Sequence, residues 1–177
     1  MRLKKICLKS SKHLNKRKLT LQPNLQSSNL WQFALQYYSK SARSRALLQL
    51  QDKYAANINL CLLLKYLSQQ NIIVSTSTIA VLHAHVTEFS QNYTQPLRQI
   101  RANFKQSLQT MENYSALRTH MLNAELELEK QEQQLLVDAF NRATANDSPP
   151  TCPLKYYLES ILAVPKTDLD QTLTQLA

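Results

Sequence analysis

Apolar residues recur at intervals of three and four along much of this chain, which is typical of α-helices that bury one face. The first such stripe consists of Leu30, Phe33, Ala34 and Tyr37. We expect its helix to begin at Asn29, whose side chain can accept a hydrogen bond from a first-turn amide while Gln32 reaches back, as in a capping box.

Two shorter helices are predicted next, after a polar link at residues 39–44. The apolar positions of the first are Ala46, Leu47, Leu50 and Tyr54. The second begins after Asn57, a favourable N-cap residue, and residues 58–67 are apolar on nearly every side. Such a helix belongs at the centre of a core. Residues 72–74 then form a buried connector.

A long antiparallel helical hairpin is predicted for residues 75–143. The run Ser-Thr-Ser-Thr at residues 75–78 caps its first helix, and Pro96 should kink that helix rather than end it. The expected inward stripe of the first helix is Ile79, Leu82, Val86, Phe89, Tyr93, Leu97, Ile100, Phe104, Leu108 and Met111. That of the second, from about residue 113, is Tyr114, Leu117, Met121, Ala124, Leu128, Leu135 and Ala139.

The C-terminal part begins with a loop at residues 144–153, which contain three of the six prolines. A short helix should follow at residues 154–164, and Pro165 ends it. Thr167 and Asp170 are spaced as a cap and a third-position acid for a last helix. Its Leu169, Leu173 and Leu176 can dock on the core.

These elements predict an all-α protein, built as a single-domain helical bundle. A basic N-terminal arm, residues 1–28, precedes one helical domain, residues 29–177. Within it, a compact three-helix unit (29–70) packs on the hairpin (75–143), and short helices (154–177) close the core. The chain has no glycine, which excludes the glycine-rich phosphate loops of P-loop and dinucleotide-binding proteins.

The net charge of +9 is concentrated in the arm, which contains eight basic residues and no acid, whereas the other 149 residues contain 13 basic and 12 acidic ones. The basic residues of the arm are Arg2, Lys4, Lys5, Lys9, Lys12, Lys16, Arg17 and Lys18. Such a segment can bind RNA, DNA or a ribosome-like surface by releasing counterions, or it can attract an anionic membrane surface. A start codon assigned too far upstream would also create it.

Enzymatic or metal chemistry has no positive support in the sequence, which lacks a nucleophile elbow and an HExxH motif. His83 and His85 point about 200° apart on a helix and cannot share a metal. We therefore predict no catalytic residue, no metal site and no cofactor. The three cysteines are widely spaced, and no apolar run approaches the roughly 20 residues that span a bilayer. A cytoplasmic protein with reduced thiols is expected.

Several short elements identify a family resemblance. Leu30, Trp31, Phe33 and Ala34 form a Leu-Trp-x-Phe-Ala box, which is followed by Leu-Gln-Asp at residues 50–52 and an Asn-Leu-rich run at residues 59–64. Residues 96–101 form Pro-Leu-Arg-x-x-Arg, and an acidic helix comes later. Over about residues 29–140, the chain resembles a family of uncharacterised gammaproteobacterial proteins. The resemblance implies a fold and no established activity.

Two positions depart from that family, whose members usually have Pro-Gly near residues 40–42 and glycine near Ala55. This chain has Ser41 and Ala42 at the first place and alanine at the second. Either these turns do not need a positive φ, or a residue other than glycine adopts it at some cost in strain.

Candidate ligand-binding residues are Asp52 and Asn59, which are polar positions between apolar stripes. An acid and an amide can fix a ligand or assist catalysis, but we favour a structural role, because buried polar side chains commonly tie helix ends and turns together. Trp31 can stack on a ligand or base, and core packing is the favoured interpretation.

Arg98, Arg101 and Lys105 lie at i, i+3 and i+7 and form a cationic stripe on one helix face. Arg98 and Arg101 are candidates for ligand binding, and all three are candidates for phosphate or other anionic contacts. We favour pairing with the acidic helix, which an antiparallel hairpin brings near. Its acids are Glu125, Glu127, Glu129 and Glu132.

The leading functional hypothesis is a non-enzymatic helical interaction protein, in which the body binds a protein partner and the arm contacts RNA or a ribosome. The alternative is a small-ligand-binding protein or enzyme with a pocket between the three-helix unit and the hairpin. Peripheral membrane association through the arm is a third hypothesis.

Overall fold

The computed structural model describes residues 24–107, 110–143 and 148–177, and within these ranges it contains helices and loops but no strand. The N-terminal helices are α1 (Ser27–Tyr38), α2 (Ser41–Tyr54) and α3 (Ile58–Gln69). The middle segments are α4 (Thr76–Phe89), the π-helical η1 (Ser90–Thr94), α5 (Gln95–Ser107) and α6 (Tyr114–Arg142). The C-terminal segments are α7 (Pro153–Tyr156), the π-helical η2 (Tyr157–Ile161) and α8 (Lys166–Gln175). The predicted all-α class is confirmed.

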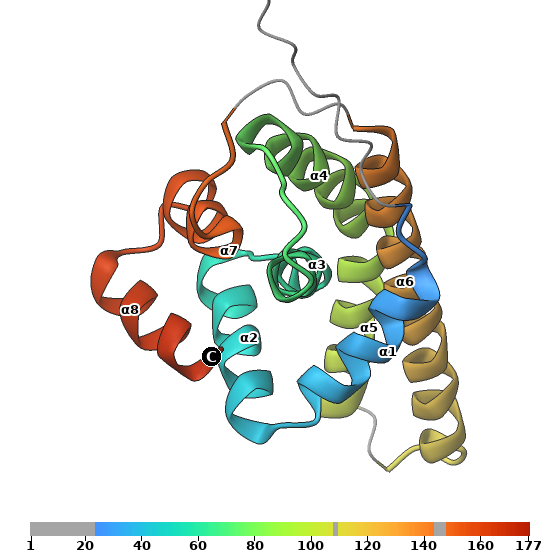
Figure 1. Cartoon of the computed structure of the whole chain (residues 1–177). Helices are drawn as coiled ribbons and strands as arrows, with labels where there is room; N and C mark the ends of the chain where they lie inside the picture. Colours follow the sequence, from blue (N-terminus) through green and yellow to red (C-terminus); the bar gives the residue numbers. More distant parts are fainter. Residues whose placement is uncertain (1–23, 108–109, 144–147) are drawn as a thin grey trace, which may run out of the picture.

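Helix α3 lies at the centre of the molecule (Figure 1). It packs against α1 and α2 on the N-terminal side and against α4, α6 and α7. Helix α6 contacts α1, α3, α4 and α5, while α8 lies beside α2. The three-helix unit therefore packs on the hairpin as the sequence predicts.

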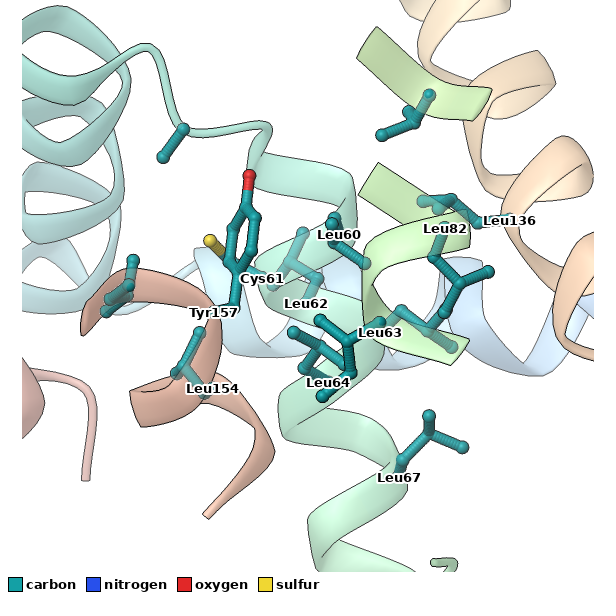
Figure 2. Packing of buried hydrophobic residues seen from close by; sticks show 14 of the residues in the cluster. Leu60, Cys61, Leu62, Leu63, Leu64, Leu67, Leu82, Leu136, Leu154 and Tyr157 are labelled. Atoms are coloured by element: carbon teal, nitrogen blue, oxygen red, sulfur yellow. The ribbon is translucent and has the colours of Figure 1, made fainter. Parts of the chain in front are cut away.

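The core is built around the leucines of α3, which are between 0 and 3% exposed. Figure 2 shows Tyr157 and Leu154 on one side of this helix and Leu82 and Leu136 on the other. The helix begins where predicted, because Asn57 Oδ1 accepts a 2.9 Å hydrogen bond from the amide of Leu60. Residues 59–64 are all buried, which explains why this part of the helix lacks an exposed polar face.

Helix α1 begins at Ser27, two residues before the predicted start, and Asn29 is not its cap. Contacts with α6 order the chain ahead of Asn29. The buried Leu25 donates its N–H to Asn141 Oδ1 at 2.9 Å and accepts from Asn141 Nδ2 at 3.0 Å. The Ser27 hydroxyl is hydrogen-bonded to Gln134. Tertiary contacts thus replace the predicted capping box.

Two more helix starts differ from the prediction. Helix α2 begins at Ser41, so the polar link is shorter than residues 39–44. Helix α8 begins at Lys166 directly after Pro165, and no side chain caps it, so the cap assigned to Thr167 is wrong. Pro165 takes the N-cap position, with φ −58° and a non-helical ψ of 145°, and its carbonyl oxygen accepts the first helical hydrogen bond, from the amide of Leu169 at 2.9 Å. Leu169 and Leu176 are buried, which confirms the docking of this helix.

The helix that begins at Thr76 continues past Pro96, as predicted, but its inward face changes at η1. The residues expected inside, Tyr93 and Ile100, are 55% and 54% exposed, whereas Ser90 and Thr94 are buried. A π-helical turn holds one residue more than an α-turn, which rotates all later positions by about 100°. The wide turn directly precedes Pro96, whose ring would clash with a carbonyl of a regular α-turn.

The inward face of α6 also differs from the predicted one. Leu117 and Ala124, which were expected to face inward, are exposed, and Glu125, Glu132 and Gln133 are buried instead. Apolar burial resumes only from Leu136 to Phe140. The N-terminal two-thirds of α6 therefore present polar side chains to the interior, so that prediction was wrong in register.

Among the residues that the structure describes, four have positive φ: Ala55, Asn71, Asn113 and Ala163. Ala55 follows α2 in the left-handed region, with φ 53° and ψ 30°. Lys40, by contrast, has φ −79°, so the link before α2 needs no glycine. The missing glycine near residues 40–42 is thus without consequence, whereas alanine at position 55 is strained.

Ala55→Gly should raise the free energy of unfolding by about 0.5–1 kcal/mol, because relief of the left-handed strain exceeds the entropy that glycine adds to the unfolded chain. Urea unfolding followed by circular dichroism measures the change. The control is Ala42→Gly inside α2, which should destabilise by about 0.5–1 kcal/mol. Destabilisation by both substitutions would contradict strain at Ala55.

Candidate functional site

A cavity of about 890 Å³ lies between the three-helix unit and the segments α4 to α6. Ligand sites in proteins commonly measure about 300–1,000 Å³. The residues of its wall with the most distinctive chemistry are Trp31 and Tyr38 of α1, Asn59 of α3, Arg98 of α5, and Glu132 and Gln133 of α6.

Arg98 connects three helices at this cavity. Its Nε donates to Glu125 Oε1 at 2.8 Å, one terminal nitrogen donates to Glu129 Oε1 at 2.9 Å, and the other donates to Gln51 Oε1 at 2.7 Å. Burial opposes the charge of Arg98, but the hydrogen bond with Glu125 and the nearby carboxylates outweigh it and raise its pKa. The guanidinium is therefore a fixed positive charge between α2, α5 and α6.

Arg101 binds the same carboxylate, donating to the two oxygens of Glu125 at 2.5 and 3.2 Å. Burial would raise the pKa of Glu125, but the hydrogen bonds from both arginines outweigh burial and lower it. The predicted pairing of the cationic stripe with the acidic helix is thus confirmed. Arg101 does not line the cavity, and Lys105 lies exposed one turn further along α5.

Glu129 is in a less favourable position than Glu125. Burial raises its pKa, and the single hydrogen bond and the charge of Arg98 offset only part of that effect. The charges of Glu125 and Glu132 raise its pKa further. Three carboxylates on one face of α6 thus compete for the positive charge of Arg98 and Arg101.

A second network joins α3 to α6 through amide side chains. The Nδ2 groups of Asn57 and Asn59 each donate to Glu132 Oε2 at 2.9 Å. Asn59 Oδ1 accepts from Gln133 Nε2, also at 2.9 Å. Asn59 therefore ties two helices together, the kind of structural role favoured from the sequence, and it also lines the cavity.

The remaining predicted residues lie at the edges of this site. Asp52 lines the cavity and is exposed to solvent. Trp31 lies on the cavity wall and outside the buried core, so core packing was the wrong interpretation; Lys130 Nζ lies 5.4 Å from its ring centroid. His83 also lines the cavity, and burial lowers its pKa.

The arm residues proposed for anionic contacts lie outside the described residues. They are Lys4, Lys5, Lys9, Lys12, Lys16, Arg17 and Lys18.

Sequence reasoning did not select Gln51, Asn57 or Gln133 for the site, and it treated Glu132 only as part of an acidic helix. One signal was present: Glu125, Glu129 and Glu132 lie at i, i+4 and i+7, on a single helix face. When acidic residues line one face of a helix and basic residues line one face of the adjacent helix, the two faces are expected to pack against each other. The amides have no comparable signal, because their partners lie between 47 and 75 residues away.

Other chemistry is sparse in the described part of the chain. No group of three His, Cys, Asp or Glu side chains there could hold a metal ion. Of the cysteines in those ranges, Cys61 is buried and Cys152 exposed, and both are free thiols. Within the same ranges, none of the helices has the length and apolar character needed to cross a membrane.

Comparison with known families adds one finding. A family model described as "Protein of unknown function (DUF2390)" matches residues 29–136, more than half of the chain. The chain belongs to this family. The DUF2390 match includes both hydrogen-bond networks, from Gln51 to Gln133, whereas α7, η2 and α8 lie beyond it. No curated protein and no solved structure matches the chain.

Glu125→Gln should lower the free energy of unfolding by about 2 kcal/mol at pH 7, because it leaves two partly buried guanidinium groups without their shared carboxylate. The folded protein lowers the pKa of Glu125 from its ordinary 4.5. The wild type therefore has this advantage above about pH 4.5 and loses it as the pH falls through the lowered pKa. Urea unfolding across that range measures the difference.

The control is Glu127→Gln on the same helix, where the side chain is 70% exposed and pairs only with Lys130. This change should cost less than about 0.5 kcal/mol at any pH. The stabilising role of Glu125 would be contradicted if both variants lost the same free energy of unfolding. It would also be contradicted if the loss caused by Glu125→Gln did not become smaller at acidic pH.

Proposed function

We propose that this protein binds a small molecule in the cavity between its three-helix unit and its hairpin. The observation that supports the proposal is a buried network of charged and amide side chains that lines a cavity. Buried charges are costly unless they are paired, and apolar residues could fill such a space at no loss of stability. The charged and amide side chains of this cavity wall are therefore better explained by ligand recognition than by a contribution to stability.

The remaining wall is apolar, with Leu35, Ile58, Leu62 and Leu126 among its residues. A few placed polar groups within a mainly apolar lining are typical of small-molecule sites. The polar groups also project from helices that the two networks hold together, so their positions are fixed before a ligand arrives. Preorganisation of this kind reduces the entropy cost of binding.

A cavity-filling variant tests this function. Ala102 lines the cavity from α5, so Ala102→Phe should block it, whereas Ala116→Phe on exposed α6 surface should not. In a thermal-shift screen of small polar metabolites, at least one compound should stabilise the wild type and Ala116→Phe, by about 2.7 kcal/mol at a hundred times its Kd. The same compound should leave Ala102→Phe unchanged.

Native mass spectrometry of the full chain provides a second readout, since a molecule retained through purification should be missing from Ala102→Phe. If every stabilising compound acted equally on Ala102→Phe, the cavity would not be its binding site, and small-molecule binding there would be refuted.

A second candidate function is macromolecular interaction, which the charge of the arm and the hairpin surface favour. The arm combines eight positive charges with no acid. Large apolar side chains are exposed on the hairpin, among them Tyr93, Ile100, Leu117 and Leu122. We propose that the arm contacts RNA and the hairpin a protein partner, in the bacterial cytoplasm that the sequence favours.

Removing residues 2–20 deletes all eight charges and preserves Leu25, which anchors α1 to α6. The deletion should abolish salt-dependent binding to a single-stranded RNA, because counterion release requires those charges. Fluorescence anisotropy at several salt concentrations measures the effect. Equal RNA binding by both proteins would refute the arm's role, and selective cosedimentation with anionic vesicles would assign it to membranes instead.

A further inference from the structure

Two buried oxygens in the cavity wall have no hydrogen-bond partner in the described part of the chain. They are Glu132 Oε1 and Gln133 Oε1. Each residue is 2% exposed, and both line the cavity. Because buried polar atoms in proteins are nearly always paired, these two oxygens, on consecutive residues of α6, are the groups that a bound molecule would satisfy.

The hydrogen-bond network identifies both atoms as acceptors. A carboxylate only accepts, so Asn59 must turn its NH₂ group towards Glu132. Its carbonyl oxygen then faces Gln133, which must donate through Nε2. The free atom of Gln133 is consequently its carbonyl oxygen. A molecule that completes this wall has to supply N–H or O–H donors to both residues.

The charges around the cavity favour a cation. The wall contains the positive charge of Arg98 and the carboxylates of Asp52, Glu129 and Glu132, and none of the described lysines contributes to it. Arg98 already donates from all three of its nitrogens to protein groups. An incoming phosphate or carboxylate would meet excess negative charge, whereas an incoming cation would reduce it.

We infer that the ligand of the proposed small-molecule site is a protonated amine, whose N–H groups bind Glu132 Oε1 and Gln133 Oε1. The inference rests on the proposed function and gives the chemical class of its ligand. The body of the amine contacts the apolar wall at Leu35, Leu62 and Leu126. Trp31 and Tyr38 also line the cavity, and their aromatic rings suit a ligand that carries a positive charge.

Three probes of similar size test the charge of the ligand on the full-length wild type: 2-phenylethylamine hydrochloride, 2-phenylethanol and sodium 3-phenylpropanoate. Isothermal titration at pH 7 and constant potassium chloride gives their affinities. The amine should bind at least about tenfold more tightly than the alcohol, and the carboxylate should bind most weakly. Equal or tighter binding of the alcohol or the carboxylate would overturn the inference without any variant.

Glu132→Gln keeps the shape of the side chain and removes its charge. It should weaken binding of the amine at least about tenfold and leave the alcohol nearly unchanged. The matched control, Glu127→Gln, lies on the exposed face of α6 and should bind the amine as the wild type does. If Glu132→Gln does not fold, Gln133→Met removes the second acceptor and should also weaken binding of the amine.

The outcomes separate this inference from the proposed function. If the alcohol or the carboxylate bound more tightly than the amine, and Ala102→Phe prevented that binding, the amine inference would be rejected and the small-molecule site retained. Failure of all three probes to bind would also reject the amine, while the metabolite screen with Ala102→Phe decides the proposed function independently. If Glu132→Gln selectively loses binding of the amine, both the amine inference and the proposed small-molecule site are supported.

Discussion

The wide turn before Pro96 determines which side of α5 points into the protein. A regular α-helix would turn Tyr93 and Ile100 inward, and the hairpin would then have an apolar interior. The extra residue of η1 rotates α5 so that Arg98 and Arg101 point towards α6 and the apolar pair is exposed. Proline explains the position of the turn, since it tolerates no regular α-turn in front of it.

The polar interior of the hairpin depends on that rotation. Once Arg98 points inward, the carboxylates of Glu125 and Glu129 can be buried beside it, because the positive guanidinium and the negative carboxylates neutralise one another. Glu132 forms no ion pair with any described residue, and the amide groups of Asn57 and Asn59 hold it instead. The charges around the cavity are therefore incompletely balanced, and this imbalance is the basis of the proposed ligand site.

Because the chain has no glycine, other residues must occupy its positive-φ positions. Ala55 and Ala163 adopt positive φ, which an alanine does at a cost of about 1–2 kcal/mol. The left-handed Ala55 ends α2 and allows α3 to begin two residues later, with Asn57 as its N-cap. The contacts of α3 and Asn57 offset the cost of the strained residue. Asn57 caps the helix through Oδ1 and binds Glu132 through Nδ2. One side chain thus serves both the fold and the candidate site.

The sequence alone determined the helical class, the central position of α3, the cap at Asn57 and the pairing of Arg98 and Arg101 with acids of α6. Each depends on local spacing or on charge complementarity along one helix face, and both are visible in a linear pattern. The starts of α1 and α8 were not, because contacts with α6 and a preceding proline replaced the expected side-chain caps.

Only the tertiary structure decided the register of the hairpin, the place of Trp31 on a cavity wall and the two unpaired oxygens of Glu132 and Gln133. A single extra residue in a turn changes no local composition, yet it rotates the rest of α5 by about 100°. Hydrogen bonds between residues some 75 positions apart likewise exist only after the helices have packed. The sequence therefore specified which helices form and which charges meet, and packing decided which buried polar atoms are left without a hydrogen-bond partner.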